Sequence, residues 1–114
     1  MADRERDSGP VIVPMPAEID LANADHVGAQ LCLAASPGVT VIVADLTATQ
    51  FCDSAGIRTL LYARDNVAAH RAQLRLAVAS GGAVRHALQA VGLQHVLPIY
   101  PTVEAALAAP PNGG

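Results

Sequence analysis

One apolar segment, residues 39–46 (VTVIVADL), restricts the folds open to this chain more than any other part of the sequence. It follows Pro37-Gly38 and contains β-branched and small apolar residues almost without a polar interruption. Side chains alternate between the two sides of a strand, so a strand of this composition needs apolar cover on both. The segment therefore predicts a strand that is buried on both faces or lies at the centre of its sheet.

Shorter apolar patterns on either side of this segment alternate between strands and helices. Further strands are expected at residues 11–15, 74–79 and 96–100, the last interrupted by Pro98. Pro14 and Pro16 lack the N–H that a sheet requires, so the first strand is expected to be an edge strand or to end early. The alternation predicts an α/β fold with a mixed, mostly parallel sheet of about four strands and about four helices.

The four helices are indicated by apolar spacing and by capping residues. The first is capped by Asp20 or Asn23 and runs to about residue 35, and the others cover residues 55–70, 84–91 and 103–109, the last capped by Thr102. The expected buried face of the first helix consists of Leu21, Ala24, Val27, Leu31 and Ala34.

Length and composition predict one globular domain. The chain has 114 residues, of which 52% are hydrophobic and only 15% charged, so it can bury a core and is not a disordered chain. Residues 1–10 are polar and mixed in charge, and residues 110–114 are rich in Pro and Gly. We expect a folded domain at residues 11–109 between two flexible tails.

The charges of the chain argue against several classes of function. The formal net charge is −3, the seven cationic residues are all scattered arginines, and lysine is absent. No basic patch is available for a nucleic acid backbone, and a receiver domain would need a lysine late in the sheet. No segment has the pattern of a signal peptide or the length of a membrane span. We therefore expect a cytoplasmic protein that does not insert into a membrane.

The turn after the central strand brings a hydroxyl and a carboxylate to the beginning of a helix. Asp53-Ser54 directly precedes the helix expected from residue 55. A helix N-terminus offers unpaired N–H groups and the positive end of the helix dipole, and both favour a negative charge. Ser54 is therefore a candidate site for adding and removing a phosphate. The alternative is purely structural, with Ser54 or Asp53 as an ordinary N-cap.

Three short motifs, in order, resemble the STAS domain, the family of anti-sigma factor antagonists and related modules. Residues 17–20 (AEID) are similar to the family's G-E-[LI]-D turn. Residues 45–46 and 51–56 (DL and FCDSAG) are similar to its D-L…F-[ILMV]-D-[ST]-[ST]-G signature, and residues 91–93 (VGL) match its usual G-L. The resemblance extends over about residues 11–107 and implies a single STAS-like α/β domain.

The resemblance also implies a site. The phosphoacceptor of anti-sigma factor antagonists is the first hydroxyl residue after the motif aspartate, which is Ser54 here. The implied partner-binding surface consists of Asp20, Asp53, Ser54, Gly56 and Ile57. The chain differs from the pattern at Ala17 and Ala55, which replace the first-motif glycine and the second hydroxyl residue. The segment before Asp20 is also short, so the usual two-stranded start is expected to be reduced to one strand.

The implied function is partner switching. The unphosphorylated protein would bind an anti-sigma factor, a serine kinase of the kinase-fold type, and phosphorylation of Ser54 would release it; a phosphatase would reverse the reaction. The alternative within the family is a subunit or scaffold of a membrane lipid-transport or stress-signalling complex that is not phosphorylated. In either case we expect no catalysis by the chain itself and no cofactor.

Other chemistry has weaker support. A thiol near a helix N-terminus can be acidic, so a redox role for Cys52 is an alternative, but the family has a core-facing apolar residue there. Cys32 is expected in the core. An enzyme with Ser54 or Cys52 as nucleophile would need a histidine nearby or a G-x-S-x-G elbow, and neither is present. No metal site is expected, because no ligand spacing is formed by His26, His70, His86 and His95.

Overall fold

The computed structural model describes residues 9–110, and these form six strands, four α-helices and one short 3-10 helix. In chain order they are β1 (Gly9–Pro14), β2 (Glu18–Ile19), α2 (Ala24–Leu33), β3 (Val39–Asp45), β4 (Phe51–Cys52), α3 (Ser54–Ala69), β5 (Gln73–Ala77), α4 (Ala83–Ala90), η1 (Leu93–His95), β6 (Ile99–Tyr100) and α5 (Val103–Ala108). The expected tails lie mostly outside the described residues, although β1 already begins at Gly9, inside the segment expected to be a tail.

The main sheet has four strands in the order β1-β3-β5-β6, and every pair of neighbours is parallel. Parallel neighbours need a long crossover between them, which helices α2, α3 and α4 supply in turn. The predicted α/β class with a mostly parallel sheet is confirmed. A second, two-stranded sheet pairs β2 with β4, also in parallel.

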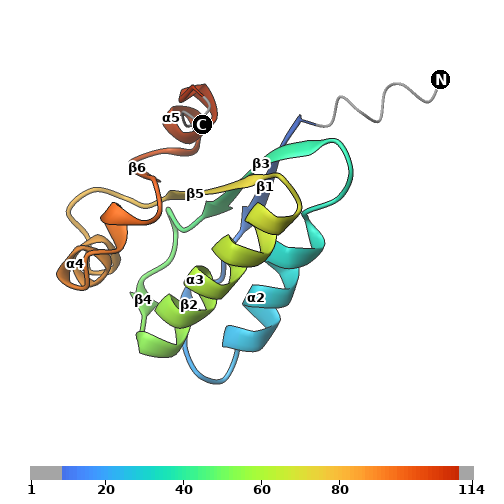
Figure 1. Ribbon diagram of the computed structural model, residues 1–114. Coiled ribbons are helices and arrows are strands. Elements are labelled where there is room, and N and C mark those ends of the chain that lie inside the picture. Colours follow the sequence, from blue (N-terminus) through green and yellow to red (C-terminus); the bar gives the residue numbers. More distant parts are fainter. Residues whose placement is uncertain (1–8, 111–114) are drawn as a thin grey trace.

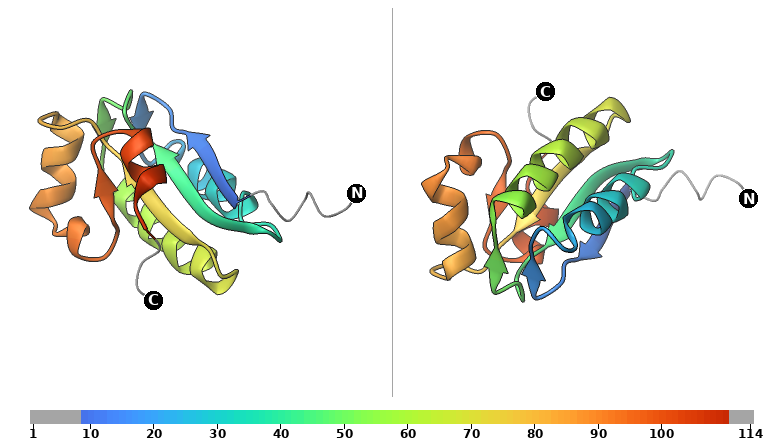
Figure 2. Two further views of the ribbon diagram at one scale, coloured as in Figure 1. Left: turned by 90° about the horizontal axis from the view of Figure 1, so that it is seen from above. Right: turned by 90° about the horizontal axis from the view of Figure 1, so that it is seen from below.

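Helices cover both faces of the main sheet (Figures 1 and 2). On one face, Ile42 of β3 belongs to the large core that also contains Val27 of α2 and Leu60 of α3. On the other face, Val43 of β3 packs in a smaller cluster with Ala106 of α5. Strand β3 is thus buried on both sides, as its sequence predicts. Helix α3 lies between α4 and α2.

Among the described residues, β1 is the outer strand beside β3, as its prolines predict. The Met15 N–H donates to the Asp45 carbonyl oxygen at 3.0 Å, so the N–H groups at positions 10, 12 and 14 point away from β3. Pro10 and Pro14 occupy two of those three positions and have no N–H to leave unpaired. The sequence therefore removes most donors from the outer edge of the strand.

The sheet carries one buried charge that the sequence patterns did not reveal. Arg75 lies in β5 on the side of α5 and is almost completely buried. Its guanidinium donates to the carbonyl oxygens of Ala106 at 2.6 Å, Ala109 at 3.0 Å and Pro110 at 3.2 Å, and its Nε donates to the Gln73 side chain at 2.8 Å. Arg75 therefore supplies hydrogen bonds to the C-terminal end of α5 and holds that end against the sheet.

Several predicted details are wrong. Leu21 is 81% exposed, because α2 begins only at Ala24 and Leu21 belongs to the turn before it. The predicted strand at residues 96–100 is reduced to β6, and η1 forms just before it. The segment before Asp20 contains a second, two-residue strand, β2, where a single strand was expected.

Candidate functional site

The small β2–β4 sheet brings two segments of the predicted site together. Ile19 pairs with Cys52, and the backbone N–H of Asp53 donates to the Ile19 carbonyl oxygen at 3.1 Å. Asp20 and Asp53 each follow the last residue of one of these parallel strands, so the two half-buried acidic residues leave the sheet at the same end. This end lies at the beginning of α3 (Figure 1).

Asp53, and not Ser54, is the N-cap of α3. The Asp53 backbone is extended, and its Oδ1 accepts a hydrogen bond from the Gly56 N–H at 3.0 Å. Ser54 is the first residue inside the helix and is exposed. Among the described residues, the Ser54 hydroxyl and the N–H groups of Ser54 and Ala55 have no hydrogen-bond partner. The structural role therefore falls to the aspartate, and the serine hydroxyl is accessible.

Gly56 is buried where α3 crosses the small sheet. A Cβ at this position would lie 2.7 Å from Cys52 Sγ, 2.8 Å from Ile19 Cγ2 and 3.1 Å from the Ile19 carbonyl oxygen. The glycine thus allows the first turn of α3 to approach β2 closely. Because Ser54 belongs to this turn, Gly56 helps to set the position of Ser54. Ile57 is half-buried and packs against the core from the next position.

Asp20 and Asn23 hold the turn before α2 through hydrogen bonds within the turn. Asp20 Oδ1 accepts from the Ala22 N–H at 3.0 Å, and Asn23 Oδ1 accepts from the Asp20 N–H at 2.9 Å. The Asn23 side chain also donates to the Glu18 carbonyl oxygen at 2.8 Å. Of the two residues predicted to cap the helix, Asn23 is the N-cap, but its side chain makes no hydrogen bond to the helix.

Two exposed apolar side chains near this end were not assigned to the site from sequence. Phe51, the only phenylalanine, is 50% exposed in β4, three residues before Ser54, and Leu21 directly follows Asp20. Large apolar side chains exposed beside polar ones are typical of surfaces that bind another protein. Phe51 was visible in the sequence, but only the pairing of β4 turns Cys52 inward and leaves Phe51 outward.

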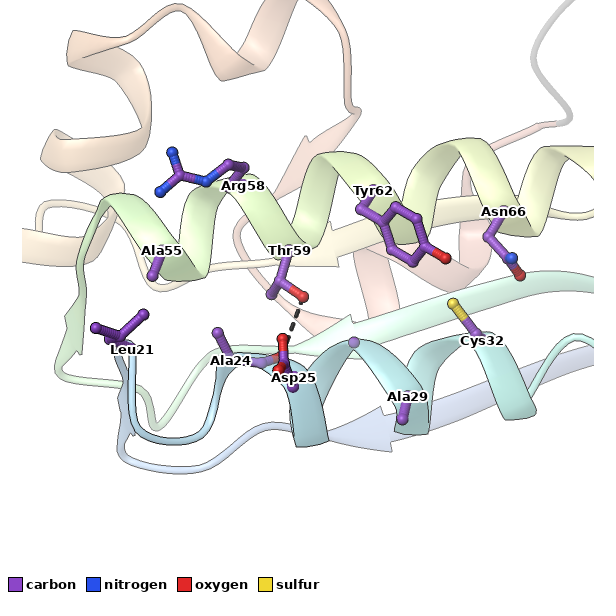
Figure 3. A pocket seen from close by; sticks show the side chains of 11 residues that line it. Leu21, Ala24, Asp25, Ala29, Cys32, Ala55, Arg58, Thr59, Tyr62 and Asn66 are labelled. Atoms are coloured by element: carbon purple, nitrogen blue, oxygen red, sulfur yellow. Dashed lines mark hydrogen bonds between the residues drawn. The ribbon is translucent and has the colours of Figure 1, made fainter.

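A groove of about 630 Å³ runs between α2 and α3 (Figure 3). Its floor is close-packed, because Gly28 of α2 faces Thr59 of α3, whose hydroxyl donates to the Ala24 carbonyl oxygen at 3.0 Å. At the end near Ser54 the groove is lined by Ala55, Arg58 and Leu21. The Arg58 side chain runs back toward the beginning of α3 (Figure 3).

The cysteines have no feature of a redox sensor. Cys52 is buried in the core, and burial, with a smaller contribution from the Asp53 carboxylate, raises the pKa of its thiol to about 11. Burial also raises the pKa of the Cys32 thiol, which lies half-buried along the groove. Reactive thiols have lowered pKa values, so the core role expected for Cys52 fits the structure better than sensing.

Neither a metal cluster nor a membrane-crossing helix occurs within residues 9–110. No three His, Cys, Asp or Glu side chains of this part gather as ligands, and none of its helices has the length and apolarity that a membrane span requires.

The sequence as a whole matches one known family. The model of the STAS domain matches residues 1–106, which is most of the chain. The chain belongs to the STAS domain family. In this STAS domain, the motif segments 17–20 and 51–56 are the ones that meet at the beginning of α3. The sequence matches none of the curated proteins with which it was compared.

Solved structures with the same fold include several anti-sigma factor antagonists. One from Mycobacterium paratuberculosis is 25% identical, with 88% of this chain and 84% of that chain covered and a TM-score of 0.74. The antagonist SpoIIAA in its unphosphorylated form is 24% identical, with 87% and 85% covered and a TM-score of 0.68. A sulfate transporter family protein from Wolinella succinogenes is 16% identical, with 87% and 82% covered and a TM-score of 0.69. The last two show a shared fold alone, and the fold serves more than one class of protein.

Proposed function

We propose that this STAS domain protein is a non-enzymatic anti-sigma factor antagonist that acts by partner switching. In its unphosphorylated form it binds an anti-sigma factor through the surface around Ser54, and phosphorylation of Ser54 releases that partner. One observation carries the proposal: the Ser54 hydroxyl is exposed at the first residue of α3, while Asp53 does the work of the cap. The family, and the anti-sigma factor antagonists among the similar structures, support it.

The unphosphorylated surface offers complementary kinds of contact. The unpaired N–H groups at the beginning of α3 can donate to an acceptor on the partner, and the exposed Phe51 and Leu21 side chains offer apolar area beside them. Asp20 and Asp53 make the surrounding surface acidic. A partner that fits this surface therefore places a hydrogen-bond acceptor against the helix N-terminus and an apolar contact beside it.

A phosphate on Ser54 changes this surface in charge and in shape. It adds nearly two negative charges, next to the Asp53 carboxylate. The helix N-terminus stabilises these charges within the free protein, whereas an interface fitted to a neutral hydroxyl has no room or counter-charge for them. A loss of a few kcal/mol is expected, which weakens binding by roughly 100-fold or more.

The partners that follow from this proposal are a serine kinase of the kinase-fold type, which is itself the anti-sigma factor, and a phosphatase that reverses the modification. The place of action is the cytoplasm, where sigma factors work. Direct membrane insertion and nucleic acid binding play no part.

Phosphate transfer from radiolabelled ATP by such a kinase tests the proposal. The parent chain is expected to accept close to one phosphate, and Ser54→Ala is expected to accept none. Ser80→Ala is the matched control, because Ser80 is exposed but lies in the loop before α4. Labelling that survives in Ser54→Ala contradicts the proposed site. Stable binding of the kinase without any labelling of the parent would favour the alternative of an unphosphorylated subunit or scaffold.

A further inference from the structure

Resting on the proposed function, we propose that Arg58 is the built-in counter-ion of phosphorylated Ser54. Its guanidinium binds the phosphate on the surface of α3. The modification then does two things at once: it adds a negative charge, and it engages a cation that has no partner among the described residues. Arg58 is a positioning residue for the phosphate, and it takes no part in the transfer.

Helix geometry places the two residues side by side. Arg58 follows Ser54 by four positions in α3, and residues with this spacing are neighbours on one face, about 6 Å apart along the helix axis. Long side chains in a helix point back toward its N-terminus, and Figure 3 shows Arg58 doing so. An anion four residues before a cation is also the more favourable order for such a pair.

Arg58 is also free for this role within the part of the chain that the structure describes. It is exposed there and makes no hydrogen bond or ion pair. The other described arginines are differently placed. Arg75 and Arg85 donate to backbone carbonyl oxygens, Arg64 lies 3.4 Å from the Asp65 carboxylate, and Arg71 lies just beyond the far end of α3.

The chemistry of the step is an ordinary phosphoryl transfer from ATP. A bond forms between Ser54 Oγ and the γ-phosphorus, the bond from that phosphorus to the ADP oxygen breaks, and the hydroxyl proton leaves to solvent. The product monoester has a second ionisation near neutral pH. A nearby guanidinium favours the dianion, because planar Arg donors pair with two phosphate oxygens at once, and this lowers the pKa of that ionisation.

Phosphorus NMR of the free protein tests the pairing without any kinase or partner. Phosphoserine is inserted at position 54 during synthesis, and the pKa of its second ionisation is measured in the parent, Arg58→Gln and Arg64→Gln proteins. The pKa in Arg58→Gln is expected to be higher than in the parent by about 0.3–0.6. Arg64→Gln is the matched control. Arg64 lies about 15 Å from Ser54 along the helix, which is beyond the Debye length of about 8 Å at physiological salt. The pKa of the phosphoserine in Arg64→Gln should therefore equal that in the parent.

Arg58→Lys separates charge from geometry. Lysine keeps the positive charge but not the planar pair of donors. The second pKa of the phosphoserine in Arg58→Lys is therefore expected between its values in the parent and in Arg58→Gln. Equal pKa values in the parent and Arg58→Gln would overturn the proposal, as would an equal rise in Arg64→Gln. The phosphoserine is already present in these samples, so neither result bears on whether Ser54 is phosphorylated by a kinase. That proposal is tested separately by the labelling experiment with radiolabelled ATP.

Discussion

At the scale of single residues, the beginning of α3 divides two roles between neighbours. Asp53 accepts the Gly56 N–H and so stabilises the first turn, while Ser54 keeps an exposed hydroxyl. Both are residue types that often cap helices, so the sequence left open which of them was the cap. The structure resolves that alternative, and the consequence for stability can be measured.

Asp53→Ala is expected to lower the free energy of unfolding by about 1 kcal/mol, because one N–H in the first turn loses its acceptor. Ser54→Ala is expected to change it by less than about 0.5 kcal/mol, because the hydroxyl has no structural bond. Urea denaturation measures both, with the exposed Asp65→Ala as a control for loss of a helix carboxylate. The opposite order, with the larger loss in Ser54→Ala, would mean that Ser54 is the cap.

Cys52 gives a prediction about pH. Its pKa is raised to about 11 in the folded protein, so an unfolded chain releases the thiol proton at lower pH than the folded one does. Stability is then retained below the unfolded pKa and lost as the pH rises toward 11, by up to about 2–3 kcal/mol. In Cys52→Val this part of the loss should be absent, so its unfolding free energy should fall less steeply between pH 9 and 11. If the free energy of unfolding fell equally with pH in the two proteins, this account would be contradicted.

At the scale of elements, the position of Ser54 depends on how closely α3 approaches β2. Gly56→Ala is expected to lower the free energy of unfolding by about 2 kcal/mol, because its Cβ would overlap the buried Ile19 and Cys52 side chains. Gly82→Ala is the matched control, since no atom lies within 4 Å of a Cβ there, and it should cost less than about 1 kcal/mol. Equal losses in the two variants, measured by urea denaturation, would show that the close approach is unimportant.

The elements that follow from local patterns were predictable. Strand β3 and helices α3 and α4 begin and end within about one residue of their predicted bounds, because their apolar spacing and terminal residues are local signals. The two-residue strands β2 and β4 were not predictable in this way. They exist only because segments distant in sequence pair with each other, and neither has a pattern of its own.

At the scale of the whole molecule, some residues of the candidate site can be predicted from sequence motifs, and others can be recognised only from the packing of the fold. Ser54, Asp53 and Asp20 were predicted as site residues from their motifs, and the structure brings their segments to one end of the fold. Arg58 and the exposed Leu21 were not assigned to the site from sequence. The spacing of Arg58 from Ser54 is visible in the sequence, but the direction of its side chain and the exposure of Leu21 before α2 are not. The buried Arg75 was missed for a similar reason: its carbonyl partners belong to α5, far along the chain.

The affinity of the chain for a kinase-fold anti-sigma factor from the same genome tests the central claim most directly. Calorimetric titration would compare the unmodified protein with the same protein carrying phosphoserine at position 54. We expect the phosphorylated form to bind roughly 100-fold more weakly, or not measurably, and Ser54→Ala to bind within a few-fold of the parent. Equal affinity of the phosphorylated and unmodified proteins would contradict the account.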